Sequence, residues 1–392
     1  MNKKNKKERI DFFSFFYKNS LIVELIIIGI VFQFFSKGLF LKTQNLSNIL
    51  LQGATCSIIA ITMCLVIITC NADLSAGRLL GMFGMIAAIL QVNLKLNSVA
   101  VLLIIYGLAI LIGFWHGFWV GYMKLPAFIV TLATQLVFNG ITLFISDGKT
   151  IGPVSGLIDL IGNKYLGSFK DGSNDTSIIL AVVVSVIYVL LVIRKELKNK
   201  KQKKMEIQWG KVIFRLVVTL AIIWGVTWIV YLHKGFSYSM LILFSLTLIM
   251  AYIVENTKFG RYMYAIGGNP ESARLSGINV SKELLKLYVL HSVMVATASL
   301  VYVGRVGQAA SAAGNGYEFT AITGCVVGGT AISGGRGSVL GAVIGTMLMA
   351  ALDNGMSILN LGVSLQYVVK GLVLLMAIAL DAYANNRKIK AV

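Results

Sequence analysis

The sequence predicts an all-α polytopic membrane protein with about twelve transmembrane helices. Of its 392 residues, 57% are hydrophobic and only 13% are charged, and the mean hydropathy is +0.81. A water-soluble domain could not bury this much apolar surface, and apolar runs of spanning length recur along the chain. Because no interval between them could hold a soluble domain of ordinary size, residues 1–392 are predicted to form a single transmembrane domain.

Twelve apolar segments approach or exceed the length that crosses a bilayer, which is about 20 residues. The predicted spans are 20–36, 49–70, 77–92, 98–123, 127–145, 177–193, 212–232, 239–254, 284–306, 317–333, 338–356 and 365–382. Glycines concentrate in 77–121 and 304–345, where small residues let helix backbones approach closely. These segments are predicted to form the packed interior.

Basic residues orient the predicted helices. They cluster at 3–18, 194–211, 258–286 and 387–390, and alternating the twelve spans puts all four clusters on one side. The positive-inside rule assigns that side, with both termini, to the cytoplasm. The net charge of +19 is thereby explained by orientation, so nucleic-acid binding is not predicted.

Residues 146–232 are interpreted as an insert into a ten-helix core. The insert contains a polar outer loop, a span, the basic linker 194–211, and a second span that carries Trp224 and Trp228. The linker is predicted to be solvated and to face membrane lipid, because lysine-rich segments beside a span are attracted to anionic headgroups.

A polar island at 260–278, GRYMYAIGGNPESARLSGI, lies between two spans. Asn269 is a good helix N-cap, Pro270 suits the first helical position, and Glu271 lies where the helix dipole favours an anion. With Gly277 as the stop, the helix has about seven residues and a length of roughly 10 Å, too short to persist alone in water.

This short helix has two interpretations. It is either an ordinary capped helix in the cytoplasmic loop 255–283, or a docking element for another protein. Arg261, Arg274 and the pair Tyr262 and Tyr264 would then supply the anchors.

Two short motifs repeat, each followed by a glycine-rich apolar run: LSAGR at 74–78 and ISGGR at 332–336. They are either plain cytoplasmic turns or the broken helices of an inverted repeat, which in transporters line a binding site near the midplane. From these motifs and the polar groups beside glycines, a substrate pathway is predicted. Its residues are Asn71, Asp73, Ser75, Ser333 and Asn354.

Catalytic and metal sites are not predicted. Residues 328–337 lack the Lys followed by Ser or Thr that a phosphate loop needs, and no nucleophile motif occurs. The four cysteines have no metal-ligand spacing, and His116 and His291 are interpreted as packing residues. A carboxylate such as Asp73 is expected either near an interface or in a functional site.

Three stretches together resemble the membrane permeases of ribose/xylose/galactose-type ABC sugar importers. They are the island 260–278, residues 324–356 (GCVVGGTAISGGRGSVLGAVIGTMLMAALDNGM) and the DLSAG at 73–77. The chain length and the insert are most similar to the xylose-permease branch. The resemblance implies a subunit of the bacterial cytoplasmic membrane that moves a pentose or hexose by alternating access.

The resemblance also implies partners. Residues 269–277 would be the coupling helix in a groove of a separate ABC ATPase, which would hold ATP and Mg, with no cofactor on this chain. An extracytoplasmic sugar-binding protein would deliver substrate, and a second permease copy would complete a homodimer. The implied coupling residues are Gly260, Arg261, Gly267, Asn269, Pro270, Glu271, Ala273, Arg274 and Gly277.

Two other functions stay open at this point. The chain could be an ABC permease for a nucleoside or a signalling sugar derivative. It could also be an ion-coupled secondary transporter, which would need a carboxylate relay, and Asp73 and Asp353 are the candidates for one.

Overall fold

The computed structural model describes residues 20–168, 173–203 and 208–389. Within them the chain is helical apart from its loops, and extended segments pair only as two isolated β-bridges. Nine helices of this described part are long and apolar enough to cross a membrane. The all-α polytopic architecture predicted from composition is therefore confirmed at this level.

The nine candidate spans include two that continue into a π-helical turn, η1 (Ile89–Asn93) and η2 (Phe118–Tyr122). They are α3 (Thr43–Ile68), α4 (Ala76–Ala88) with η1, α5 (Ser98–Gly117) with η2, α6 (Ala127–Ser146), α8 (Asp175–Lys203), α9 (Trp209–Tyr231), α10 (Tyr238–Asn256), α13 (Val280–Val306) and α15 (Val339–Ile358).

The remaining helices are shorter or have shorter apolar stretches. They are α2 (Ser20–Phe35), α7 (Gly156–Asn163), α11 (Lys258–Gly268), α12 (Pro270–Leu275), α14 (Tyr317–Val327) and α16 (Val363–Ile389). The span predicted at 317–333 is too long, because α14 ends at Val327 where Gly328 and Gly329 follow, the latter with a φ of 89°.

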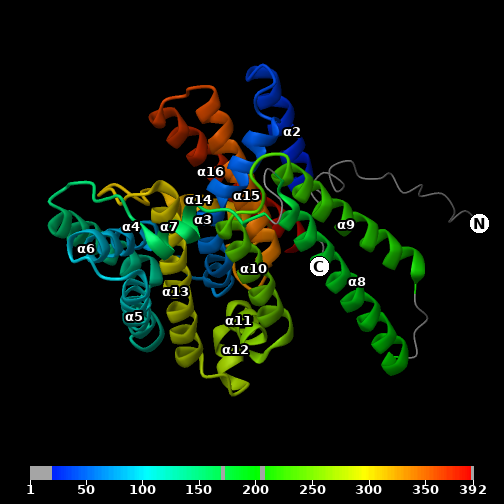
Figure 1. Ribbon diagram of the computed structural model, residues 1–392. Coiled ribbons are helices and arrows are strands. Elements are labelled where there is room, and N and C mark those ends of the chain that lie inside the picture. Colours follow the sequence, from blue (N-terminus) through cyan, green and yellow to red (C-terminus); the bar gives the residue numbers. More distant parts are fainter. Residues whose placement is uncertain (1–19, 169–172, 204–207, 390–392) are drawn as a thin grey trace, which may run out of the picture.

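Helix α3 is the centre of the molecule. Every residue from Gly53 to Ile68 is buried, and α10, α13, α14 and α15 pack around it. A membrane helix that is buried on all sides is covered by protein rather than lipid. In Figure 1, α3 lies behind α10 and α15, and α13 runs beside it.

The predicted glycine-rich interior is confirmed at close helix contacts. Gly113, Gly117 and Gly121 follow one another at four-residue spacing and lie directly against the α13 backbone at Val289, Leu285 and Ser281, respectively. Gly324 and Gly328 of the α14 segment meet Gly341 and Gly345 of α15 in the same way. Small residues at this spacing allow the van der Waals contact that holds membrane helices together.

The two ends of the bundle are formed by different loops. The first, which we name the α12 end, holds α11, α12, the last turn of α3 and the loop 328–337, to which Tyr264 donates a hydrogen bond at the Gly337 carbonyl (2.9 Å). The second, the α7 end, holds α7 and the turn after α13, where the Val154 amide donates to the Gly307 carbonyl (2.9 Å).

The segment 146–232 is not a uniform insert. Residues 151–163, with α7, pack on α13, whereas α8 and α9 form a hairpin that projects away from α5 and α6 in Figure 1. Of the predicted basic clusters, 3–18, residues 204–207 of the linker and Lys390 of the last cluster lie outside the described part of the chain.

Candidate functional site

The short helix predicted in the polar island is present as α12, Pro270–Leu275. The Asn269 side chain accepts a hydrogen bond from the Ser272 amide (2.9 Å), which is the N-cap geometry, and Pro270 occupies the first turn. At the other end Gly277 has a φ of 83°, and its amide donates to the Arg274 carbonyl (2.9 Å). Local sequence chemistry is therefore sufficient to explain where this helix begins and ends.

One face of helix α12 packs on the bundle, and the other face is exposed. On the packed face Ala273 is only 4% exposed, and the helix contacts α11 and α13. On the free face Leu275 is 78% exposed, and Glu271 and Arg274 form an exposed ion pair at 2.6 Å. The Arg274 guanidinium, by hydrogen bond and charge, lowers the pKa of Glu271.

The preceding helix, α11, is not predicted from the sequence. It buries Gly260 against the Val254 carbonyl and Gly267 against the Ile68 carbonyl, while Arg261 is exposed at the surface. The implied coupling residues therefore divide into two groups. Gly260, Gly267 and Ala273 are buried against the bundle, and Arg261, Asn269, Pro270, Glu271, Arg274 and Gly277 are exposed.

A buried polar cluster lies deeper in the bundle. The Oδ1 atom of Asp73 accepts hydrogen bonds from the Ser75 amide (2.7 Å) and hydroxyl (2.6 Å). Its Oδ2 atom lies at ion-pair distance, 3.4 Å, from Nε2 of His291, whose Nδ1 is 2.8 Å from the Thr62 hydroxyl. Asp73 is 0% exposed and His291 is 1% exposed, so both side chains are enclosed by protein.

The position of these partners shows that residues 69–75 re-enter the bundle. Thr62 lies six residues before the end of α3, and His291 is well inside the 27-residue α13. The chain therefore leaves α3 at the α12 end, turns back to the depth of Thr62 and only then begins α4. Such backbone is tolerated at depth where protein satisfies it, and Thr131 does so by accepting from the Leu74 amide (3.1 Å).

A second interrupted segment reaches the same place from the α7 end. Residues 307–316 run inward from Gly307, and the Gly314 backbone lies in direct contact with Gly77 at the start of α4. Helix α14 begins at Tyr317, so the N-termini of α4 and α14 meet inside the bundle. Glu318 lies here with 1% exposure, and neither carboxylate oxygen has a hydrogen-bond partner among the described residues.

The repeated motifs 74–78 and 332–336 are therefore not symmetric partners. Residues 332–336 form a turn at the α12 end, where the Cys70 thiol lies 3.1 Å from the Ser333 carbonyl. The segment that contacts the start of α4 inside the bundle is 307–316, and it does not contain the motif found at 74–78. Residues 332–336 are therefore a plain turn, whereas residues 73–78 belong to a broken helix.

The five predicted pathway residues do not form one cluster. Asp73 and Ser75 are together, and Asn71 donates to the Thr69 carbonyl (3.0 Å) at the end of α3. Asn354 accepts from Asn45 (2.8 Å) near the other end of α3, and α3 is 26 residues long, or about 39 Å. Their role in transport stays a prediction.

Two residues of the buried cluster are missed by sequence reasoning. His291 is interpreted as packing because no second ligand follows at metal spacing, but its partner comes from a distant segment. Glu318 carries a usable signal, since it is the sole charged residue of the predicted span 317–333. An isolated charge within an apolar segment indicates a functional position.

The described residues do not include a candidate metal site. They contain no group of three or more His, Cys, Asp or Glu side chains that could hold a metal ion, and the four cysteines are free.

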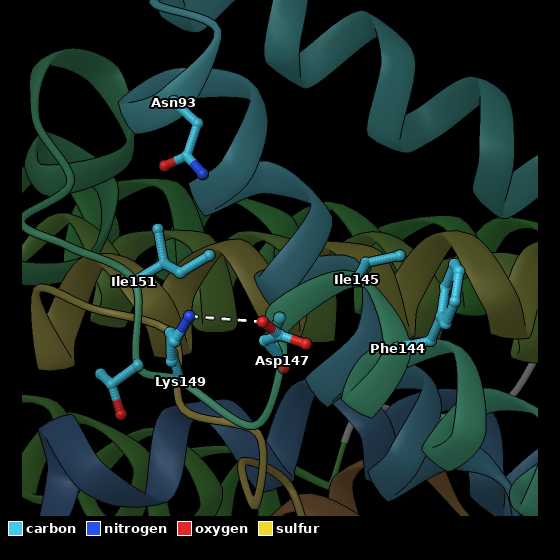
Figure 2. A pocket seen from close by; sticks show the side chains of 8 residues that line it. Asn93, Phe144, Ile145, Asp147, Lys149 and Ile151 are labelled. Atoms are coloured by element: carbon cyan, nitrogen blue, oxygen red, sulfur yellow. Dashed lines mark hydrogen bonds and ion pairs between the residues drawn. The ribbon is translucent and has the colours of Figure 1, made fainter.

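Figure 2 shows an open pocket formed by Asn93, the end of α6 and the loop after it. Its Lys149 and Asp147 pair at 3.3 Å and are both largely exposed, and the hydroxyl of its buried Ser146 donates to the Thr142 carbonyl within α6 (2.7 Å).

Comparison with known proteins identifies the class. Residues 45–378 match the family described as branched-chain amino acid transport system / permease component. The chain belongs to this permease family. The match covers the buried cluster and every candidate span except the first two residues of α3, and this permease is a multi-pass protein of the bacterial cytoplasmic membrane.

Curated relatives cover nearly the whole permease. It is 38% identical to the xylose transport system permease protein XylH of Escherichia coli K12, over 94% of this chain and 92% of that protein. It is 30% identical to the galactose/methyl galactoside import permease protein MglC of the same strain (94% of each chain) and to the ribose import permease protein RbsC of Haemophilus influenzae (95% of each). No solved structure matches significantly. The resemblance to sugar-import permeases is thus confirmed.

Proposed function

We propose that this permease is the membrane subunit of an ATP-driven ABC importer for a monosaccharide, with a xylose-type pentose favoured. The family description names branched-chain amino acids, but the relatives matched along nearly their whole length are named for xylose, galactose and ribose. Identity is higher to the xylose proteins than to the other two. This difference supports the xylose-type substrate.

The observation that carries the proposal is the geometry of α12. A six-residue helix, capped at both ends and backed by α11 and α13, presents Leu275, Glu271 and Arg274 away from the chain. Exposed Leu275 and a guanidinium are suitable anchors for a groove on another protein. In the proposed complex that protein is an ABC ATPase on the cytoplasmic side, and it holds ATP and Mg.

The other end of the bundle faces the sugar-binding protein in this proposal, and a second copy of the permease forms the homodimer. Membrane lipid covers the apolar outer surface. Substrate passes by the meeting point of α4 and α14, where Asp73, Ser75 and Glu318 lie. Carboxylate oxygens accept hydrogen bonds from sugar hydroxyls, and helix N-termini at midplane depth are typical of transporter sites. Asn71, Ser333 and Asn354 would lie toward the ends of the path.

One reconstitution experiment distinguishes this proposal from two alternatives, which are a different substrate and an ion-coupled secondary transporter. The permease is placed in proteoliposomes with its ATPase and binding protein, and uptake of xylose, a nucleoside and leucine is compared. ATP-dependent xylose uptake supports the proposal, and preference for the nucleoside or leucine reassigns the substrate. Uptake by the permease alone, driven by a proton or sodium gradient, would support a secondary transporter using Asp73, His291 and Glu318.

Variants of α12 test the coupling itself. Leu275→Ala, Glu271→Gln and Gly277→Ala should leave membrane insertion intact and reduce uptake per ATP hydrolysed. Gly277→Ala acts through strain, because an alanine at its left-handed φ costs about 1–2 kcal/mol. Normal coupling in all three variants would remove the ATPase assignment from α12.

A further inference from the structure

We propose that a three-way backbone junction at the end of α3 passes the movement of α11 and α12 to the buried segment that carries Asp73. The junction consists of Gly267, residues 68–70 and residues 333–335. This inference rests on the proposed function, since it assumes that a partner ATPase moves α12. It adds Ile68, Cys70 and Gly335 as positioning residues that touch neither the ATPase nor the substrate.

The first contact of the junction joins α11 to α3. Gly267 packs so closely on the Ile68 carbonyl that a β-carbon there would collide with it, and the same β-carbon would lie 2.7 Å from the Gly335 amide nitrogen. The Gly335 amide in turn donates to the Ile68 carbonyl (2.9 Å). That carbonyl is one of those left without a partner by the end of a helix, so three segments share one backbone group.

The second contact is made by Cys70. Its thiol lies 3.1 Å from the Ser333 carbonyl and 3.5 Å from the Gly267 carbonyl, which are the same two segments. Cys70 has a φ of 59°, a left-handed conformation that turns the chain back toward the bundle. A β-carbon at Gly334 would collide with the Cys70 sulfur, so the two segments are in direct contact there.

The junction continues directly into the re-entrant segment. Between Cys70 and Asp73 lie only Asn71 and Ala72, and Asp73 is tied to Ser75 and lies beside His291. A displacement of Gly267 must therefore either break the contacts at Ile68 and Cys70 or move the start of the Asp73 segment. Close-packed backbone transmits displacement, whereas a loose loop would absorb it.

A pair of adjacent glycines provides the test. Gly267→Ala places a methyl group into the Ile68 carbonyl, whereas a β-carbon at the neighbouring, exposed Gly268 would have open space within 4 Å, so Gly268→Ala is the matched control. In the full complex with ATPase and binding protein, Gly267→Ala should lower sugar uptake by about tenfold while ATP hydrolysis stays within about twofold of wild type, a coupling loss of about 1.4 kcal/mol. Gly268→Ala should match wild type in both measurements.

The native Cys70 supplies a readout that needs no variant. Cys70 is exposed while Cys56, Cys64 and Cys325 are buried, so N-ethylmaleimide labelling of the Cys70 peptide reports on the junction. Its rate should differ by about threefold or more between nucleotide-free and vanadate-trapped complexes of wild type, and should lose this difference in Gly267→Ala. Because the wild-type rate is measured first, the inference remains testable even if Gly267→Ala does not assemble.

The outcomes separate the two levels of the proposal. A wild-type complex without ATP-dependent uptake contradicts the proposed function. A coupled wild-type complex in which Gly267→Ala behaves like Gly268→Ala, or in which the Cys70 labelling rate is the same in both nucleotide states, contradicts the junction alone.

Discussion

His291 Nε2 lies 3.4 Å from Asp73 Oδ2, and the two side chains are buried between α3, α4 and α13. This relationship holds the re-entrant segment 69–75 against a helix that crosses the whole bundle. Thr62 at the other nitrogen of His291 and Ser75 at the other oxygen of Asp73 complete a chain of four polar side chains. It connects α3, α13 and the start of α4, and all four side chains are buried.

Removing one member of this pair should destabilise the permease. Asp73→Asn or His291→Leu leaves the remaining polar group buried without its partner, a situation that costs about 1–3 kcal/mol in proteins. Thermal unfolding in detergent should show a clearly lower midpoint for each variant. The double variant Asp73→Asn, His291→Leu should lose less than the sum of the two.

The exposed pair of α12 provides the control for this cycle. Glu271→Gln removes a partner of Arg274 at the surface, where water replaces the interaction, so the unfolding midpoint should not change. Additive losses at Asp73 and His291 would show that the two side chains do not interact.

Glu318 should respond in the opposite direction. Its carboxylate has no hydrogen-bond partner among the described residues, and a charge at this depth costs about 2.5–3.5 kcal/mol on insertion scales. Glu318→Gln should therefore raise the unfolding midpoint, while the KM for sugar uptake rises because a hydroxyl acceptor is lost.

Asp353 is the matched carboxylate for this comparison. Its Oδ2 pairs with Lys370 Nζ at 2.8 Å, so Asp353→Asn should lower the midpoint. If Glu318→Gln lowers the midpoint as well, Glu318 makes a stabilising contact and the assignment of a free acceptor is wrong.

The α5 and α13 contact predicts opposite effects for two glycines of one helix. A β-carbon at Gly113 would collide with the Val289 backbone, whereas Gly107 has open space around it. Gly113→Ala should destabilise by about 1–3 kcal/mol through overpacking, and Gly107→Ala should be neutral or stabilise by up to about 1 kcal/mol through helix propensity. Unfolding midpoints measured side by side decide this, and equal values would mean that the two helices separate readily.

The pH dependence of coupling follows from Glu271. Arg274 lowers the pKa of Glu271 below its ordinary value of 4.5, so the interaction is fully present above that value and is lost only as the pH falls through the lowered pKa. Uptake per ATP hydrolysed should consequently be independent of Glu271 titration between about pH 6 and about pH 8. The ratio of wild type to Glu271→Gln, measured across this range, should stay constant, and a ratio that changes would implicate another titrating group.

Local features of this permease were predictable because they depend on near neighbours in the chain. The cap at Asn269, the stop at Gly277 and the apolar runs of the helices follow from residue types a few positions apart. The same local rules did not predict α11. This helix follows α10 after a single residue, Thr257, so its residues were assigned, together with those of α12, to one polar island. The local rules also overextended the span at 317–333, where two glycines end α14.

The candidate site was only partly predictable for a different reason. Asp73 and Ser75 were identified from a motif, but Ser333, which belongs to the second copy of that motif, and Asn354, a polar group beside a glycine, lie elsewhere. His291 and Thr62 gained significance only because α13 and α3 bring them to Asp73 from 218 and 11 residues away along the chain.

The amino-acid sequence by itself determined that this chain is a helical membrane protein, where its short capped helix begins, and which permeases it resembles. Apolar length, capping chemistry and motif spacing are properties of short stretches, so they need no knowledge of the fold. Only the tertiary structure decided that α4 and α14 start inside the bundle, that Glu318 lies between them without a hydrogen-bond partner among the described residues, and that Gly267 rests on the end of α3. Each of these depends on which distant backbones come within van der Waals distance, and packing of the whole chain sets that.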